Sequence, residues 1–207
     1  MAVRTRREEY RESLRQDILD AAREMFVREG YEATSVRRIA EKCSCSPGIL
    51  YHYFDDKAAI MAQLVRETFV KLTHRMHAIA EDADASALDR LRRICLTYIA
   101  FGIENPHHYG VLFATSYPGH EKPKVIAAAF EEEGFRTFNC LQHTVLACIS
   151  DGLLRPELTD EKEVSQAIWA ALHGMASVFM DCHGFPFIEQ SRLIGRHVDI
   201  LIEGVRA

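Results

Sequence analysis

Residues 35–53 decide the fold, and they read SVRRIAEKCSCSPGILYHY. Apolar residues at helical spacing predict a short helix over 35–42, with Thr34 as the expected N-cap. A Cys-Ser-Cys break follows, and Ser46-Pro47 then begins a second short helix, because serine caps a helix and proline fits its first position. Two short helices joined by a tight break form a helix-turn-helix, which we expect at about residues 35–54.

Helical spacing of apolar residues continues on both sides of this motif. Upstream, apolar residues recur at three- and four-residue steps from Leu14 to Phe26, and Gly30 is a typical stop for that helix. Downstream, Asp55 can cap a longer helix. Further helical patterns are expected at 88–103, at 106–115, at 123–149 with Gly134 weakening its middle, after Asp160, and from Leu193 to Val205. No alternating strand pattern occurs, so the sequence predicts an all-α protein.

Composition limits the classes of protein to which this chain can belong. Its 207 residues suit one or two domains, and 48% hydrophobic with 27% charged residues is a globular balance. The formal net charge is −5, and residues 1–57 hold eleven basic and eleven acidic side chains. Binding to nucleic acid therefore needs a local basic surface. Neither an apolar run of about eighteen residues nor a secretory leader occurs, so we expect a cytoplasmic protein with reduced cysteines and no membrane contact.

The second short helix carries side chains suited to contacting a duplex. Gly48 has no side chain, so a phosphate or a base edge can approach its backbone closely. Tyr51, His52 and Tyr53 offer hydrogen bonds and flat rings to phosphates, bases or thymine methyl groups. A three-helix core without a DNA role explains the apolar positions. It does not explain why Ser46-Pro47-Gly48 is followed by Tyr51-His52-Tyr53 in this helix. We therefore expect the N-terminal segment to bind DNA.

Residues 14–65 resemble the DNA-binding domain of the TetR family of bacterial transcriptional regulators. The resemblance rests on residues with the family's internal spacing: Ile18-Leu19-Asp20-Ala21-Ala22, Phe26, Gly30 to Val36, Ile39-Ala40, Ser46-Pro47-Gly48, Leu50 to Phe54, and Lys57. It implies that phosphates are touched by Thr34, Ser35 and Arg37, and also by Lys57. It further implies that the residues facing the major groove are Ser46, Pro47, Gly48, Tyr51, His52 and Tyr53.

Two positions depart from the family pattern. Ser44 stands in the turn where the family usually has glycine, and a serine adopts the left-handed turn conformation only with strain. Cys45 stands where the family has a small aliphatic residue. We interpret Cys45 as a small buried hydrophobe. A redox or metal site made by Cys43 and Cys45 is the alternative.

The C-terminal part resembles the family more loosely. Trp169, His173 and Gly174 resemble the tryptophan–histidine–glycine helix of one TetR subclass, and the segment from Tyr98 to Tyr109 is similar to the one preceding it there. Trp169 and His173 lie one helical turn apart, so they can equally fill a core. The resemblance implies an N-terminal three-helix helix-turn-helix domain over 1–57 and a C-terminal helical ligand-binding and dimerisation domain over 58–207.

In this family the C-terminal helices enclose a pocket for a small-molecule effector and also form the homodimer. Such pockets are mostly apolar with a few polar groups. The candidate lining residues are therefore Tyr98, Phe101, Tyr109, Phe113, Phe138, His143, Trp169, His173 and Met175, each of which singly also suits a plain core. The expected dimer element is the stripe of Leu193, Ile194, His197, Leu201, Ile202 and Val205, unless this stripe packs only within its own chain.

The implied function is a repressor that binds a palindromic double-stranded DNA operator as a dimer and is released by a small molecule. The alternatives are an all-α enzyme and a small-molecule-binding protein that does not bind DNA. No glycine-rich phosphate loop, Gly-x-Ser-x-Gly elbow or His-Glu-x-x-His pattern occurs, so neither enzyme activity nor a cofactor is expected. Histidines such as His107-His108 lack tight ligand spacing, so no metal site is expected from them.

Overall fold

The computed structural model describes residues 6–115, 117 and 121–207. Over these residues the chain forms helices and loops, with one isolated antiparallel bridge between Leu154 and Arg206. The predicted all-α class is therefore confirmed. In this part of the chain, no helix combines the length and the apolar character that a bilayer span requires. The described residues of 1–68 and 107–132 form one compact unit, and those of 69–106 and 133–207 form a second one.

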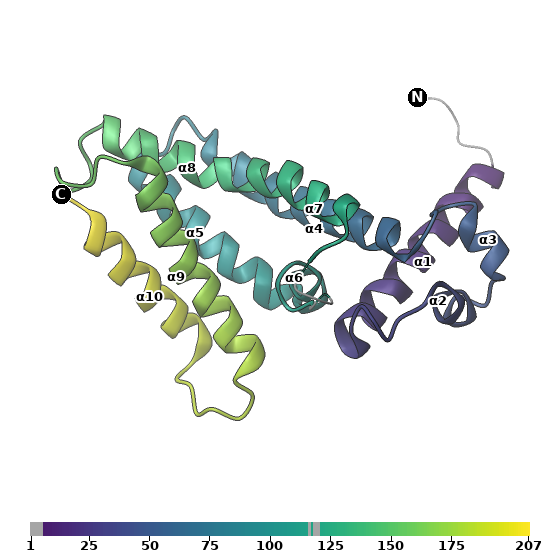
Figure 1. Cartoon of the computed structure of the whole chain (residues 1–207). Coiled ribbons are helices and arrows are strands. Elements are labelled where there is room, and N and C mark those ends of the chain that lie inside the picture. The colour runs from purple at the N-terminus through teal and green to yellow at the C-terminus, as the bar shows by residue number, and fades with distance from the viewer. Residues whose placement is uncertain (1–5, 116, 118–120) are drawn as a thin grey trace. The chain divides into compact units, whose positions relative to one another are not determined.

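The first unit has a core made by one apolar face of each helix. Its elements, labelled in Figure 1, are α1 (Arg6–Glu29), α2 (Val36–Lys42), α3 (Pro47–Tyr51), the start of α4 (Lys57–Ala80), α6 (Pro106–Phe113) and α7 (Lys124–Ala129). Ile18, Ile39, Leu50 and Ile60 are each 0% exposed. Burying such a side chain contributes about 1.5–3 kcal/mol. This packing holds α2 and α3, which are too short to persist alone.

The N-terminus of α2 differs by one residue from the prediction. Ser35, not Thr34, is the N-cap, since the Ser35 Oγ accepts the Arg38 N–H at 3.3 Å. Thr34 is buried and donates its hydroxyl to the Gly30 carbonyl at 2.9 Å. The threonine therefore fixes the turn after α1, and the serine that follows it satisfies one of the free amides of α2.

The starts of α3 and α4 follow the same capping chemistry. Ser46 caps α3 as predicted, because its Oγ accepts the Ile49 N–H at 3.3 Å. Asp56, not Asp55, caps α4, because its Oδ1 accepts the Ala59 N–H at 2.7 Å. Adjacent aspartates offer equal capping chemistry, and the register of α4 against the core selects the second one.

The break between α2 and α3 is a left-handed turn in spite of its serine. Ser44 has a φ of 54°, and no other described residue apart from glycine has a positive φ. This conformation costs a residue with a Cβ about 1–2 kcal/mol. Cys45 is half-buried. The prediction of a small buried hydrophobe at this position is therefore wrong, because the turn leaves this side chain partly exposed.

The second unit is built around α5 (Ala87–Glu104). Figure 1 shows α5 packed among α8 (Phe135–Ser150), α9 (Glu161–Asp181) and α10 (Gln190–Val205). Asp160 caps α9 as predicted, because its Oδ1 accepts the Lys162 N–H at 2.8 Å. The chain passes from the first unit into the second within α4.

The single helix predicted over 123–149 is interrupted. Between α7 and α8 the chain forms a π-helix, η2 (Phe130–Gly134). A Cβ on Gly134 would lie 3.3 Å from the Phe69 Cζ, so the glycine permits a close approach to the α4 side chain. The glycine that weakens the helix in the sequence thus coincides with the place where the hydrogen-bond pattern changes.

Candidate nucleic-acid interface and aromatic cluster

α3 presents an exposed tip on a buried anchor. Leu50 is 0% exposed and holds the helix against the core, whereas Tyr51 is 55% exposed. Ser46, Pro47 and Gly48 are exposed as well. A Cβ on Gly48 would meet only the Ser46 Oγ, at 3.9 Å, so internal packing does not require the glycine. The position is therefore open to close approach by another molecule.

The residues around the tip face solvent to different degrees. His52 is exposed and Tyr53 is half-buried, while Ser35 is exposed at the N-terminus of α2. The Arg37 side chain is 81% exposed and donates from Nε to the Glu41 Oε1 at 3.1 Å. Such exposed pairs one turn apart contribute only about 0.3–0.5 kcal/mol. Arg37 can therefore exchange its carboxylate for a phosphate with little loss. Thr34, in contrast, uses its hydroxyl inside the chain.

Lys57 braces the loop between α1 and α2. Its Nζ donates to the Tyr31 carbonyl at 2.9 Å and to the Thr34 carbonyl at 3.3 Å. The same Nζ lies 4.3 Å from the centre of the Tyr31 ring and 3.7 Å from the Glu32 Oε1. An ammonium has three N–H donors, so two carbonyl bonds leave one donor, for which the Glu32 carboxylate and a phosphate would compete.

Sequence reasoning missed a charged network between α1 and α4. The Arg23 side chain is 9% exposed, pairs with Asp20, and places its Nη2 3.7 Å from the Glu67 Oε2. Its Nε and Nη2 are buried, and neither has a hydrogen-bond acceptor among the described residues. Arg15 reaches the other oxygen of Glu67 at 3.6 Å. Arg15 and Arg23 are eight residues apart, which puts both on one face of a helix. This spacing is the feature of the sequence that could have predicted the network.

In the second unit, four of the predicted effector residues come together. The Trp169 Nε1 donates to the Tyr98 hydroxyl at 3.0 Å. The Phe138 ring meets the Trp169 ring edge-on, with centroids 6.4 Å apart, and the His173 ring lies 5.9 Å from it. Trp169 is 38% exposed, whereas Tyr98 is buried. Burial lowers the pKa of His173, although Asp181 opposes this shift. The cluster is largely apolar and carries few polar atoms.

The other predicted effector residues do not join this cluster. Tyr109 and Phe113 belong to the first unit, where their rings lie tilted against each other with centroids 4.7 Å apart. Phe101 is 1% exposed in the core. His143 is exposed on α8, and Met175 is half-buried on α9. The effector residues predicted from the sequence are thus distributed over both units.

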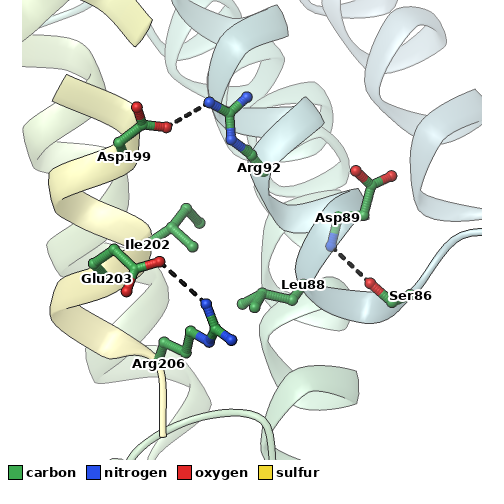
Figure 2. A pocket seen from close by; sticks show the side chains of 8 residues that line it. All are labelled: Ser86, Leu88, Asp89, Arg92, Asp199, Ile202, Glu203 and Arg206. Carbon is green, nitrogen blue, oxygen red and sulfur yellow. Dashed lines mark hydrogen bonds and ion pairs between the residues drawn. The ribbon is translucent and has the colours of Figure 1, made fainter. Parts of the chain in front are cut away.

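A separate hollow of about 520 Å³ lies between the start of α5 and the end of α10. Two ion pairs lie in its wall, as Figure 2 shows: Arg92 with Asp199, and Arg206 with Glu203. Their N–O distances are 2.5 Å and 3.3 Å. None of the predicted effector residues lines it. Its wall is formed by Ser86, Leu88, Asp89, Arg92, Asp199, Ile202, Glu203 and Arg206.

The outer faces of α9 and α10 carry exposed apolar side chains. Ile200 is 63% exposed and Val178 is 37% exposed. Ala170 and Gly174 are exposed small residues on α9. Of the predicted dimer stripe on α10, Ile202 is buried and the other five residues are half-buried, so this stripe packs partly within its own chain.

The sequence matches two family profiles. Residues 18–64 match the profile described as "Bacterial regulatory proteins, tetR family". Residues 91–201 match the profile described as "Tetracyclin repressor-like, C-terminal domain". The two matches lie on either side of the second half of α4.

Curated relatives match only part of the chain. The HTH-type transcriptional repressor Rv1474c of Mycobacterium tuberculosis is 38% identical over 73 residues, which cover 35% of this chain and 37% of the relative. The HTH-type transcriptional repressor AcnR of Corynebacterium glutamicum is 40% identical over 58 residues, which cover 28% of this chain and 31% of the relative. The chain thus matches little more than a third of the length of these relatives.

Solved structures match nearly the whole chain. The MbdR regulator of Azoarcus sp. CIB has a TM-score of 0.76 at 21% identity, covering 93% of this chain and 98% of that chain. The ketosteroid transcriptional regulator KstR2 of Mycobacterium tuberculosis has a TM-score of 0.73 at 22% identity, covering 100% and 97%. A complex of SmeT with triclosan has a TM-score of 0.75 at 15% identity, covering 94% and 92%. At these identities the likeness concerns the fold.

Proposed function

Because the chain belongs to the tetR family of bacterial regulatory proteins, we propose that it is a ligand-responsive transcriptional repressor. It binds a palindromic operator as a homodimer and leaves the operator when a small molecule binds. It performs no catalysis and works in the cytoplasm. The resemblance of Trp169, His173 and Gly174 supports assignment to the tryptophan–histidine–glycine subclass.

The observation that carries this proposal is the exposed tip of α3 on its Leu50 anchor. The N-terminal residues of a recognition helix must reach base edges while the rest of the helix stays packed. Ser46, Pro47, Gly48 and Tyr51 are exposed and Leu50 is buried, which is the required division. Residues 18–64, which include α3, match the tetR family profile, and the relatives Rv1474c and AcnR are both described as repressors.

The contacts with DNA divide by chemistry. Ser46, Pro47, Gly48, Tyr51, His52 and the exposed part of Tyr53 face the major groove and read bases. Ser35, Arg37 and the remaining donor of Lys57 bind phosphates. Thr34 shapes the backbone that presents Ser35, since its own hydroxyl is bonded to Gly30.

The effector binds in the second unit against the aromatic cluster around Trp169. Small molecules prefer mostly apolar surroundings with a few placed polar atoms. The rings of Phe138 and Trp169 supply the apolar surroundings. The Tyr98 hydroxyl and the His173 ring supply the polar atoms. A structural neighbour, SmeT, is described as a complex with triclosan.

The division of labour that we propose gives DNA reading to residues 1–57 and effector binding and dimerisation to residues 58–207. The exposed apolar face of α9 and α10, including Val178 and Ile200, pairs with its copy across a two-fold axis. An effector shifts the dimer between two spacings of its reading heads, and α4 transmits the shift because it extends through both units. Coupling of about 1–3 kcal/mol is typical for such regulation.

Selection of bound fragments from a genomic DNA pool tests the proposal. The full chain is expected to enrich an inverted repeat, and its affinity falls steeply as salt rises. Tyr51→Ala is expected to lose specific binding by about 1–3 kcal/mol per contact. Phe135→Ala is the matched control, because Phe135 is a similarly exposed aromatic residue at 62% in the second unit. A chain that enriches no sequence, or a Tyr51→Ala variant that binds like Phe135→Ala, contradicts the proposal.

A further inference from the structure

A segment that lies far along the sequence packs on the end of α1 and on the loop that follows it. The described residues of 107–132 belong to the first unit, although α5 before them and α8 after them belong to the second one. A Cβ on Gly110 of α6 would lie 3.1 Å from the Val27 Cγ1, so α6 approaches α1 closely at this point. The Tyr117 ring meets the Tyr31 ring with centroids 5.2 Å apart. The loop between α1 and α2 is therefore held by a part of the chain outside the helix-turn-helix.

Tyr31 is the centre of these contacts. Its side chain is 4% exposed, and its ring stacks on the Phe26 ring with centroids 5.5 Å apart. Aromatic pairs attract each other at centroid separations of about 4.5–7 Å, which includes both ring contacts of Tyr31. The Lys57 Nζ lies 4.3 Å from the centre of the same ring. Tyr117 and Phe26 thus fix the ring on which the Lys57 ammonium rests.

The position of this loop determines where the expected phosphate donors lie. The Lys57 Nζ donates to the Tyr31 carbonyl at 2.9 Å and to the Thr34 carbonyl at 3.3 Å, so a shift of the loop moves the ammonium or breaks these bonds. Ser35, the N-cap of α2, follows Thr34 directly. Hydrogen bonds from nitrogen to oxygen form only at about 2.7–3.2 Å, so a displaced donor loses its phosphate.

The Tyr117 ring, not its hydroxyl, makes the contact with Tyr31. Tyr117 is 9% exposed, and its hydroxyl is buried without a hydrogen-bond partner among the described residues. Burial raises the pKa of Tyr117, and it raises the pKa of Tyr31 to about 12, so both phenols stay neutral at physiological pH. A buried hydroxyl without a partner lowers stability. Phenylalanine at this position would therefore keep the ring contact and lose nothing with the hydroxyl.

We propose that Tyr117 is a positioning residue for DNA binding, which holds the loop between α1 and α2 and thereby places Lys57 to bind a phosphate. Because Tyr117 is buried, it acts through these residues and does not itself touch DNA. The inference rests on the proposed function, since it concerns how the DNA-reading part is held. It assigns a role in DNA binding to a residue that lies within the C-terminal profile match, 91–201.

Binding of the full chain to two duplexes tests this role: one enriched from the genomic pool and one of random sequence, each at about 50 and about 200 mM salt. Tyr117→Ala is expected to weaken binding to both duplexes by a similar factor, because a phosphate contact carries no sequence information. If each protomer of a dimer loses one phosphate contact, the slope of log affinity against log salt falls by about 1.8. The advantage of wild type over the variant then shrinks by about tenfold between the two salt concentrations.

Three further variants separate positioning from stability. Tyr117→Phe keeps the ring and is expected to bind DNA like wild type. Ile126→Ala truncates a fully buried side chain of α7 in the same unit, so it should lower the free energy of unfolding without changing the salt slope. Lys57→Ala should lower the slope as Tyr117→Ala does. Combining these two changes should add little to either one, because both remove the same phosphate contact.

Urea unfolding checks that each variant is folded under the binding conditions, and Tyr117→Leu replaces Tyr117→Ala if the alanine variant is unfolded. An unchanged slope in the folded variant, or additive effects of Tyr117→Ala and Lys57→Ala, overturns the inference and leaves the proposed function standing. A Tyr117→Phe variant that binds as weakly as Tyr117→Ala also overturns it, because the ring would then not be the group that acts. Wild type that binds neither duplex contradicts the proposed function and this inference with it.

Discussion

The tip of α3 and the aromatic cluster around Trp169 are both partly exposed surfaces with tyrosine or tryptophan at their centre, but they are assembled differently. The tip consists of neighbours in sequence, from Ser46 to Tyr53, presented by a single buried side chain, Leu50. The cluster draws Tyr98, Phe138 and Trp169 from three helices of the second unit. The first surface therefore depends on one local anchor, while the second depends on how distant helices pack.

The sharpest test of this difference is Leu50→Ala. Removing a fully buried leucine side chain from the first unit is expected to lower the free energy of unfolding by about 2–5 kcal/mol. Specific DNA binding should fall with it, because α3 loses its anchor. Ile49→Ala, at a neighbouring position that is 40% exposed, is the control and should change stability little. Urea unfolding measures both, and equal losses would mean that α3 is not held by this single side chain.

The second-largest loss of stability is expected from a change in the charged network that joins α1 to α4. Glu67→Gln keeps the shape of the side chain but leaves the buried Arg23 guanidinium without its distant carboxylate. We expect a loss of about 1–3 kcal/mol in the free energy of unfolding, as for a buried polar group deprived of its partner. Glu12→Gln is the control, because Glu12 also lies 3.7 Å from an arginine, Arg15, but is 53% exposed. A Glu67→Gln variant as stable as Glu12→Gln would show that the network contributes nothing.

Tyr98→Phe addresses the second surface. The substitution removes the hydroxyl that accepts the Trp169 N–H and retains the ring. The expected loss is about 0.5–1.5 kcal/mol in the free energy of unfolding, with weaker effector binding and unchanged operator affinity in the absence of effector. Calorimetric unfolding and an effector titration give the two readouts. A loss of operator affinity in the unliganded variant would mean that the cluster also shapes the DNA-binding part.

The smallest expected effect is a pH dependence confined to the second unit. Burial lowers the pKa of His197 from its ordinary value of 6.5, although the bond to the Ala171 carbonyl opposes the shift. The neutral ring is thus favoured in the folded chain, and the unfolded chain takes up the proton first. The contribution of His197 to stability is present above pH 6.5 and is lost as the pH falls from there through the lower folded pKa.

Urea unfolding of wild type and His197→Asn at pH 7.5 and at pH 5.5 measures this contribution. The variant should lose less stability between the two pH values than wild type does. An equal loss in both proteins would assign the pH dependence to other groups.

Most of the fold of the first unit was predictable because its signals are local. The Ser46-Pro47 start of α3 was predicted correctly. The errors were of one residue, at Ser35 and at Asp56, where two adjacent residues carry the same capping chemistry and only packing chooses between them. The burial of Cys45 was predicted wrongly, because the sequence pattern does not show how far a side chain in a turn is exposed.

The candidate site was predictable in a more limited way. The exposed positions agree with the expectation: Ser46, Pro47, Gly48 and Tyr51. Thr34 and Lys57, however, bond to groups within the chain, which the sequence pattern did not predict. Tyr98, Phe138, Trp169 and His173 form one cluster, but Tyr109 and Phe113 lie in the other unit. Their roles in binding stay predictions. Aromatic residues at helical spacing look alike in a sequence, whether they line a pocket or fill a core.

The sequence by itself determined where most helices lie and the helix-turn-helix, because apolar spacing and capping hydrogen bonds act between residues three or four positions apart. Only the tertiary structure decided what Lys57 braces, that Arg15 and Arg23 share Glu67, and that Trp169 meets Tyr98. These contacts join residues that are distant along the chain, and the free energy that selects them comes from the packing of whole helices. A linear pattern does not record that packing.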